Sequence, residues 1–243
     1  MRFVRLALFL PALLLLAFST PSASRALTGR ALSGLSAKIN DVLSITNGVS
    51  SYTAWNLGAY GLSQQAFELA EKGFRVLQER HLLRKTSLLT VVDYSQPSTR
   101  KRLYVIDMQR GKLLFHTLVA HGRNSGYNYA SSFSNEESSL KSSLGFFITQ
   151  GTYTGANGYS LKLKGCETGI NDHAMERAIV VHGADYVSDD FIRSNGYLGR
   201  SYGCPAIPVK VHEQLINKIK NGSCMFLFYP EKTYLAQSKI LDK

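Results

Sequence analysis

The sequence has little cysteine and lacks the common nucleotide-binding and metal-binding motifs. Its 243 residues include three cysteines, and they contain no dinucleotide fingerprint, phosphate-binding loop, HExxH sequence or internal repeat. These absences leave nucleotide-dependent enzymes and the common zinc peptidases without support. With 44% hydrophobic and 19% charged residues, the chain has the composition of an ordinary globular protein and is long enough for one sizeable core.

Runs of basic residues are also absent, although the chain is strongly basic. It has 28 Lys and Arg against 17 Asp and Glu, which gives a formal net charge of +11. The basic residues are dispersed and no nucleic-acid-binding motif occurs, so we expect no nucleic-acid partner. For an exported protein of this charge, the expected anionic partner is a polymer of the cell envelope or a membrane surface.

Long apolar runs are confined to the N-terminus. Arg2 and Arg5 flank an apolar run over residues 6–18, and small residues follow up to Ser24. This order is typical of a secretory signal peptide over residues 1–24. The run is short for a membrane span and no cysteine follows it, so we expect cleavage near Ser24 without a membrane or lipid anchor. The expected location is the periplasm or the cell envelope.

An odd number of cysteines in an oxidising compartment leaves at least one thiol free or paired between chains. Cys204 lies between Gly203 and Pro205, in a turn where a thiol can be reactive, and a reactive thiol would have to stay reduced. For Cys166 and Cys224, a structural disulfide and two buried free thiols both remain open.

The part of the chain after the signal peptide is helical in pattern. Residues 25–84 are predicted to form a helical segment ahead of the main domain. Ser63 is a predicted N-cap, and apolar residues recur at near-helical spacing over residues 67–82. We expect this helix to pack its apolar stripe on the domain. Trp55 and Tyr60 either anchor the segment or bind substrate.

From residue 87 the pattern changes from that of a helix to that of strands. Short apolar runs bounded by turn residues predict a mostly-β domain over residues 85–232, either a mixed sheet or a sandwich, with peripheral helices. The predicted strands cover residues 88–92, 102–108, 112–120, 179–181 and 225–229, and a second helix is predicted over residues 209–220. The polar tail, residues 233–243, is expected to be peripheral.

A long polar stretch, residues 120–155, follows the predicted strands and shows little periodicity. A loop of this length in a compact domain is more often functional than a simple linker. Arg123 has donors that suit an anion or a peptide carboxylate. Hydrogen bonding within the loop is the alternative, and it remains equally open.

The residues best suited to chemistry lie between positions 179 and 208. A predicted strand ends in His182-Gly183, and the motif Arg200-Ser201-Tyr202-Gly203-Cys204 follows after a polar connection. A thiolate is the reactive form of cysteine, and a neighbouring imidazole can accept its proton. Backbone N–H groups of a glycine-containing turn can hold an oxyanion. On these residues alone, a Cys204–His182 dyad and two unrelated residues of the core or surface both remain possible.

This segment resembles the active-site signature of the L,D-transpeptidase catalytic domain (YkuD-like) family, in which a His-Gly precedes a Ser/Thr-His-Gly-Cys turn. The phrases VAHGRNSG and KSSLGFF add to a resemblance that runs from about residue 103 to residue 229. Tyr202 stands where the family usually has histidine, and Pro205-Ala206 replace an apolar residue and an arginine. These departures resemble a divergent branch of murein L,D-transpeptidase catalytic domain proteins.

The resemblance implies a YkuD-like mixed β fold and a cysteine acyltransferase that acts on peptidoglycan stem peptides without a cofactor or metal ion. It implies Cys204 as the nucleophile and His182 as the base. It further implies that the backbone of Ser201 orients the imidazole, and that the N–H groups of Gly203 and Cys204 form an oxyanion hole. The candidate substrate contacts are Arg123, Ser143, Gly145, Gly183, Arg200 and Tyr202.

Three other functions remain open at this stage. A carboxypeptidase would use the same dyad and pass the acyl group to water. A metallopeptidase would need ligands drawn from His121, His173, His182 and Cys204, for which no known ligand spacing is present. A non-catalytic module would bind peptidoglycan without using the thiol.

Overall fold

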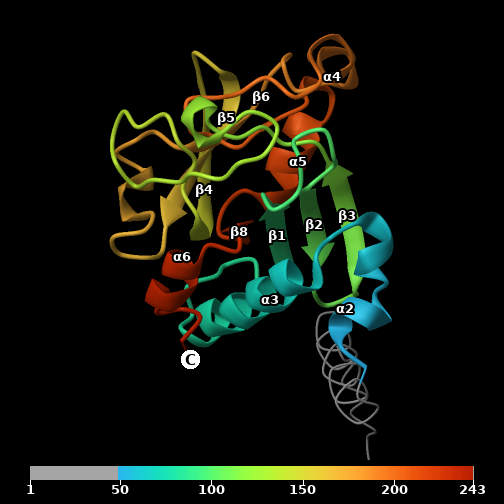
Figure 1. Cartoon of the computed structure of the whole chain (residues 1–243). Coiled ribbons are helices and arrows are strands. Elements are labelled where there is room, and N and C mark those ends of the chain that lie inside the picture. Colours follow the sequence, from blue (N-terminus) through green and yellow to red (C-terminus); the bar gives the residue numbers. More distant parts are fainter. Residues whose placement is uncertain (1–48, 243) are drawn as a thin grey trace, which may run out of the picture.

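The central feature of the computed structural model, which describes residues 49–242, is a mixed sheet of eight strands (Figure 1). The order across the sheet is β3-β2-β1-β8-β4-β5-β6-β7. The strands are β1 Leu88–Asp93, β2 Leu103–Asp107, β3 Lys112–Thr117, β4 Gly145–Gly155, β5 Gly158–Gly165, β6 Val180–Gly183, β7 Ala206–Ile207 and β8 Cys224–Phe228. The pairs β1–β8 and β6–β7 are parallel, and the other pairs are antiparallel. The prediction of a mostly-β fold with peripheral helices is confirmed, in the form of one mixed sheet.

The described α-helices lie outside this sheet. They are α2 Ser51–Ala54, α3 Gln64–Glu79, α4 Asp189–Asn195, α5 Val209–Ile219 and α6 Lys232–Gln237. In the described part of the chain, no helix is long and apolar enough to span a membrane. The predicted signal peptide, residues 1–24, and the first part of the predicted helical segment lie outside the described residues.

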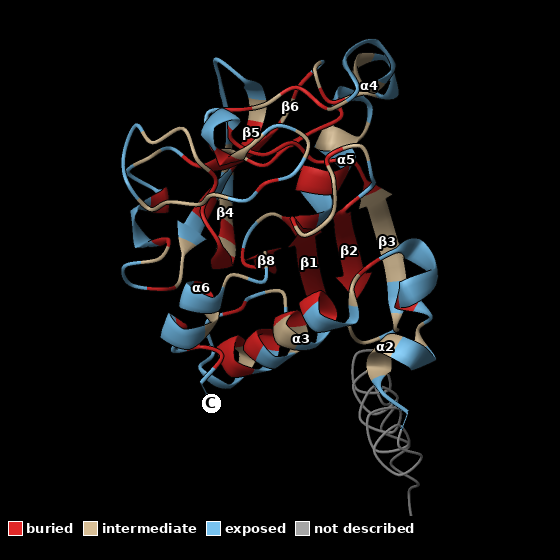
Figure 2. Ribbon diagram, viewed as in Figure 1, coloured by how far each residue is buried: buried red, intermediate tan, exposed pale blue. Residues whose placement is uncertain are grey.

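Helix α3 packs on the middle of the sheet. Its N-cap is Ser63, whose side chain accepts a hydrogen bond from a backbone N–H of the first turn. The buried face of α3 includes Phe67, Phe74 and Leu77, and the helix contacts β1 and β8, which are buried along their whole length (Figure 2). Burying one such side chain contributes about 1.5–3 kcal/mol, so this face is sufficient to hold the helix. The predicted N-cap and apolar stripe are confirmed.

Trp55 anchors the chain before α3 to the sheet. Its ring packs edge-on against the Phe67 ring, with 5.8 Å between the centroids. It also covers Gly111 in the β2–β3 turn, where an added Cβ would lie 2.3 Å from the indole nitrogen. Tyr60 makes a similar edge-on contact with the His116 ring at 6.0 Å. Of the two alternatives for these aromatic residues, the structure shows anchoring contacts.

The C-terminal tail is not peripheral, so that prediction is wrong. Tyr234 and Leu241 are buried, and the hydroxyl groups of Tyr234 and Ser238 both donate to the carboxylate of buried Glu167. The same carboxylate accepts a hydrogen bond from the Phe146 N–H at 2.7 Å. The tail is therefore tied to β4, and its apolar residues are too sparse to produce a recognisable period.

The chain that leaves β3 runs to the opposite edge strand of the sheet. Ala120 pairs with Ala206 of β7 in an antiparallel bridge, and Gly122 pairs with Ser201 in a parallel bridge. We call this junction the seam. It connects the two edges of the sheet, and the turn that carries Cys204 lies on it.

Candidate active site

Cys204 lies two residues before β7, where the parallel β6–β7 ladder begins. In that ladder His182 pairs with Ala206. The Val180 N–H donates a hydrogen bond to the Cys204 sulfur at 3.5 Å, and the thiol donates to the Ala178 carbonyl oxygen at 3.7 Å. The sulfur therefore has one contact that favours the thiolate and one that favours the protonated thiol.

Burial is the largest influence on this thiol, and it raises the pKa of Cys204. The Val180 N–H and the positive charge of Arg177 act in the opposite direction and lower the same pKa. Because the net shift is upward, Cys204 is protonated at neutral pH. It therefore needs a base before it can attack a carbonyl.

His182 is held in a single tautomer by its own strand. Its Nδ1 lies 3.0 Å from the Gly183 carbonyl oxygen, and because a carbonyl only accepts, Nδ1 carries the proton. The Nε2 lone pair is then free to accept a proton. Burial lowers the pKa of His182, which keeps the ring neutral at pH 7. In this structure His182 and Cys204 share no hydrogen bond.

Ser201 has a different role from the one that the family resemblance implies. The backbone group that orients the imidazole is the Gly183 carbonyl, and the Ser201 carbonyl accepts instead from the Arg123 N–H at 2.8 Å. The Ser201 hydroxyl donates to the Cys204 carbonyl at 2.6 Å. Ser201 therefore holds the nucleophile turn in shape, and the expectation that it orients His182 is wrong.

Gly203 is required by the shape of the turn. Its φ of +126° is unfavourable for other residues, and an added Cβ would lie 2.9 Å from the Lys141 carbonyl oxygen. The Gly203 N–H donates to the Ser201 hydroxyl at 3.1 Å, so in this arrangement it is not available to an oxyanion. The Cys204 N–H lies against the cysteine's own sulfur. Of the two implied oxyanion donors, the Gly203 N–H would first have to give up its hydrogen bond to Ser201. The Cys204 N–H lies beside the sulfur and has no such bond to another residue.

Arg177 lies beside the Cys204 turn, although it was not among the predicted substrate contacts. Its guanidinium lies beside the nucleophile turn, since Nη2 would be 3.5 Å from a Cβ added to Gly203. It donates to loop 134–143 through the Ser134 and Lys141 carbonyl oxygens, both at 2.7 Å. It also donates to the Ser143 hydroxyl at 2.5 Å. The sequence shows only an arginine just ahead of a strand, and this pattern does not reveal the contact.

An exposed group of tyrosines and arginines borders the same turn. The Arg200 guanidinium lies 4.3 Å above the Tyr127 ring and 5.5 Å from the Tyr197 ring, and Arg123 lies 6.0 Å above the Tyr202 ring. Tyr202 and Tyr127 are 70% and 68% exposed, which is unusual for large aromatic side chains. We call these five residues the tyrosine–arginine surface. Tyr127 and Tyr197 were not among the residues predicted from the sequence.

Three other predicted substrate contacts have protein partners in the structure. Gly183 holds His182 through its carbonyl and packs under the His212 ring, where an added Cβ would lie 2.8 Å from the ring. Ser143 is bonded to Arg177. At Gly145 an added Cβ would lie 2.2 Å from the Glu167 carboxylate. The structure thus places Gly145 in the buried anchor of the C-terminal tail and not beside the thiol.

His121 is committed to a structural contact. It is fully buried, its Nδ1 accepts from Arg102 at 2.7 Å, and its Nε2 donates to the Gly126 carbonyl at 3.2 Å. Burial, together with the charge of Arg102, lowers the pKa of His121 to about 4. Both ring nitrogens are occupied, which argues against the metallopeptidase alternative. Within residues 49–242 no three His, Cys, Asp or Glu side chains gather as metal ligands would.

Cys166 and Cys224 are free thiols, so of the two open alternatives the disulfide is not formed. Burial, followed by the nearby charge of Glu167, raises the pKa of Cys166 to about 12. Burial, followed by the nearby Cys166 and Glu167, raises the pKa of fully buried Cys224 well above its usual value. Neither thiol is poised to act as a nucleophile.

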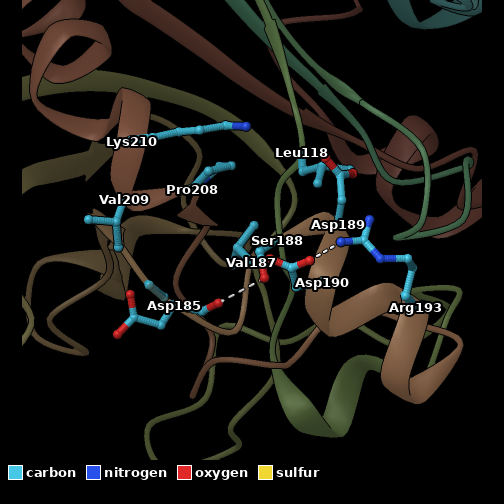
Figure 3. A pocket seen from close by; sticks show the side chains of 11 residues that line it. Leu118, Asp185, Val187, Ser188, Asp189, Asp190, Arg193, Pro208, Val209 and Lys210 are labelled. Carbon is cyan, nitrogen blue, oxygen red and sulfur yellow. Dashed lines mark hydrogen bonds and ion pairs between the residues drawn. The ribbon is translucent and has the colours of Figure 1, made fainter.

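A pocket of about 330 Å³ lies beyond the other ends of β6 and β7 (Figure 3). Its walls include Leu118, Asp185 and Lys210, and an ion pair between Asp190 and Arg193. The pocket follows both strands along the chain, whereas Cys204 precedes β7. Neither Cys204 nor His182 lines this pocket, and we assign it no role in the chemistry.

A family model described as L,D-transpeptidase catalytic domain (YkuD_2) matches residues 59–228, which is well over half of the chain. The match begins before α3, so it includes the helix that the sequence reading placed ahead of the catalytic domain. No curated protein matches the chain.

Solved structures with a similar fold include several L,D-transpeptidases. An L,D-transpeptidase from Mycobacterium smegmatis is 13% identical, with 59% of each chain covered and a TM-score of 0.37. One from Stackebrandtia nassauensis is 17% identical, covering 62% of this chain and 59% of that one, with a TM-score of 0.36. The helical cell shape determining protein Pgp2 from Campylobacter jejuni is 16% identical, covering 60% and 49%, with a TM-score of 0.38. The chain thus spans less than two thirds of each of these proteins.

Proposed function

Because the chain belongs to the L,D-transpeptidase catalytic domain family, we propose that it is an L,D-transpeptidase acting on peptidoglycan stem peptides through a thioester on Cys204. The observation that supports the proposal is the β6–β7 register, which pairs His182 with Ala206, two residues after Cys204. The free Nε2 of His182 and the protonated thiol supply the two halves of a general-base step.

In the first half-reaction, Nε2 of His182 takes the thiol proton while the sulfur attacks the carbonyl between the L-configured diamino acid centre and the terminal D-residue. The carbonyl oxygen becomes an oxyanion that the Cys204 N–H can stabilise. When the intermediate collapses, the amide C–N bond breaks and the imidazolium returns its proton to the departing amine. The product is a thioester on Cys204.

In the second half-reaction, an amine of another stem attacks the thioester carbonyl. Nε2 of His182 takes a proton from that amine, a new amide forms and the sulfur leaves as the thiolate, which regains the proton. Water in place of the amine would give a carboxypeptidase with the same residues. The ratio between these two outcomes depends on how well the site holds the acceptor.

The tyrosine–arginine surface is the proposed binding surface for the stem peptide. Arg200 and Arg123 carry positive charge beside the nucleophile turn, and stem peptides carry carboxylates that a guanidinium binds well. Tyr202 is the member of this surface nearest to Cys204 along the chain.

We further propose that the protein is exported and that its signal peptide is cleaved near Ser24. Mass spectrometry of the mature N-terminus tests this proposal.

The test is intact-mass spectrometry of the mature protein with a defined tetrapeptide stem, with and without an amine acceptor. A transpeptidase gives an acyl-enzyme when the stem is present alone and a cross-linked product when the amine is added. Hydrolysis alone would support the carboxypeptidase alternative. Equal binding of peptidoglycan by wild type and Cys204→Ala, with no acyl-enzyme in either, would identify a binding module and contradict the proposal.

A further inference from the structure

We propose that Arg177 is a positioning residue for the nucleophile, which fixes loop 134–143 against the Cys204 turn and stabilises the thiolate through its charge. The inference rests on the proposed function only in taking Cys204 as the reactive thiol. It concerns the state of the sulfur before any substrate is bound.

The turn that carries Arg177 is closely tied together. The Arg177 N–H donates to the His173 carbonyl at 2.9 Å, and the Ala178 N–H donates to the Met175 carbonyl at 3.1 Å. Ala178 has a φ of +52°, a conformation that residues other than glycine seldom adopt and that the surrounding bonds must hold. This turn aims the Ala178 carbonyl, and the Val180 N–H that follows it, at the sulfur.

The guanidinium has no freedom to serve as a mobile substrate clamp. Nη1 donates to the Ser134 carbonyl and the Ser143 hydroxyl, and Nη2 donates to the Lys141 carbonyl and, at 3.3 Å, to the Ser139 hydroxyl. Each terminal nitrogen carries two N–H groups, so all four are used. Arg177 therefore acts on the site from a fixed position.

The same loop grips the nucleophile turn directly. The Ser142 hydroxyl donates to the Gly203 carbonyl at 3.0 Å and accepts from the Gly122 N–H at 3.0 Å. Arg177 is hydrogen-bonded to Lys141 and Ser143, the residues on either side of Ser142. These bonds keep the Ser142 hydroxyl in place against the Gly203 carbonyl. Removing the guanidinium would loosen the loop and the turn together.

Arg177 is the cation whose charge acts on the sulfur. Val180 N–H assists it, while burial and the Ala178 carbonyl favour the neutral thiol. Tyr94 and Tyr186 also interact electrostatically with the thiol, and both are neutral because burial raises their pKa values to about 12. The other ionisable groups nearby are His182 on β6, which is neutral at pH 7, and Glu136, whose charge acts on Arg177.

The experiment is the pH dependence of alkylation of Cys204 by iodoacetamide, read from the Cys204 peptide by mass spectrometry. In Arg177→Gln we expect the midpoint of the rate profile to rise by about one pH unit, since an adjacent opposite charge typically shifts a pKa by about 1–3 units. Arg177→Lys keeps the charge and should restore at least half of that shift. Arg193→Gln, which removes an exposed arginine at the distant pocket, is the matched control and should leave the midpoint unchanged.

An unchanged midpoint in a folded Arg177→Gln protein would overturn the proposal. So would an equal rise in Arg177→Gln and Arg177→Lys, because a purely structural role does not distinguish a retained charge from a lost one. If Arg177→Gln does not fold, Arg177→Lys alone decides: a midpoint close to wild type supports the proposal, and a rise of a full unit contradicts it. Alkylation needs no stem peptide, so failure of the proposed function would leave this result standing.

Discussion

Two polar clusters built around an arginine lie next to the seam, and they differ in what their reactive groups are left to do. In one, Arg102 is fully buried and donates to the Gln96 and Val119 carbonyls and to Nδ1 of His121. The other nitrogen of His121 is also bonded to protein. The second cluster is built around Arg177, whose four terminal N–H groups all donate hydrogen bonds to protein. Beside it, Cys204 and His182 keep atoms that can still react.

The difference lies in the proposed nucleophile, Cys204, and the proposed base, His182. The Cys204 sulfur receives contacts that support both of its protonation states, and Nε2 of His182 has no hydrogen-bond partner within residues 49–242. His121, with both nitrogens bonded, is held near pKa 4 and cannot act as a base without losing a buried contact. A histidine whose two ring nitrogens are both hydrogen-bonded to protein thus stabilises the fold. A histidine with one nitrogen left without a partner can exchange a proton with a substrate or a thiol.

The largest effect is expected from the variant that removes the proposed nucleophile. Cys204→Ser should abolish acyl-enzyme formation, because a hydroxyl is far harder to deprotonate than a thiol and His182 is the only activating base proposed. Intact mass after incubation with stem peptide measures it. Retained turnover in this variant would show that the reactive group lies elsewhere.

The next effect comes from the base. His182→Ala should slow acylation by about 10²–10⁴-fold at neutral pH. Wild type should lose activity on acidification, as Nε2 becomes protonated. The variant should instead need alkaline pH, near or above the ~8.5 of a free thiol, because burial raises the pKa of Cys204. A variant that acylates at pH 7 as fast as wild type would disprove the dyad.

Breaking the cluster around Arg102 should lower the free energy of unfolding and should not change the alkylation midpoint of Cys204. Arg102→Met removes the donor for three acceptors, and we expect a loss of about 2–4 kcal/mol in the free energy of unfolding, since each buried unsatisfied group costs about 1–3 kcal/mol. Denaturant unfolding measures it. Arg100→Met, at an exposed neighbouring position, is the control and should stay within about 0.5 kcal/mol of wild type. A changed Cys204 alkylation midpoint in folded Arg102→Met would mean that the two clusters are coupled.

The smallest effect concerns the other two thiols. The double variant Cys166→Ser and Cys224→Ser should acylate Cys204 at the wild-type rate, because both thiols are held protonated by burial. A stability loss of about 1–3 kcal/mol is expected from the polar hydroxyl placed at fully buried Cys224. Loss of acylation in a folded double variant would contradict the assignment of Cys204 as the sole nucleophile.

Local pattern was enough to predict β1, β2, β3, β6 and β8 and the two longer helices, but it missed β4, β5 and β7. Strand β4 lies inside the stretch 120–155, which was predicted to be a long loop. The run of residues 88–92 became β1, and the cap at Ser63 begins α3. Local pattern also identified His182 and Cys204 as candidate site residues, because His182 ends a predicted strand and Cys204 follows a glycine in a predicted turn. These are features of period and turn chemistry, which act over a few residues.

The contacts that surround the thiol depend on pairing between distant segments. Cys204 meets Ala178 and Val180 because β7 runs parallel to β6 in one particular register, and no local pattern states which strands are neighbours. The contacts of Arg177 with loop 134–143 also join segments that are far apart in the sequence, whereas the contact of His182 with the Gly183 carbonyl is between neighbours in the chain. The buried tail was missed because its contact with Glu167 is also long-range.

The seam has a consequence for the order in which the protein folds. The environment of Cys204 is assembled from segments near residues 120, 142, 178 and 203, which are far apart along the chain. Such non-local contacts form late, because loop closure must precede them. Until these segments have come together, the Cys204 sulfur lacks its contacts with Ala178 and Val180 and is more exposed than in the folded protein. An oxidant or a thiol reagent would capture Cys204 most easily during this interval, before the site has formed.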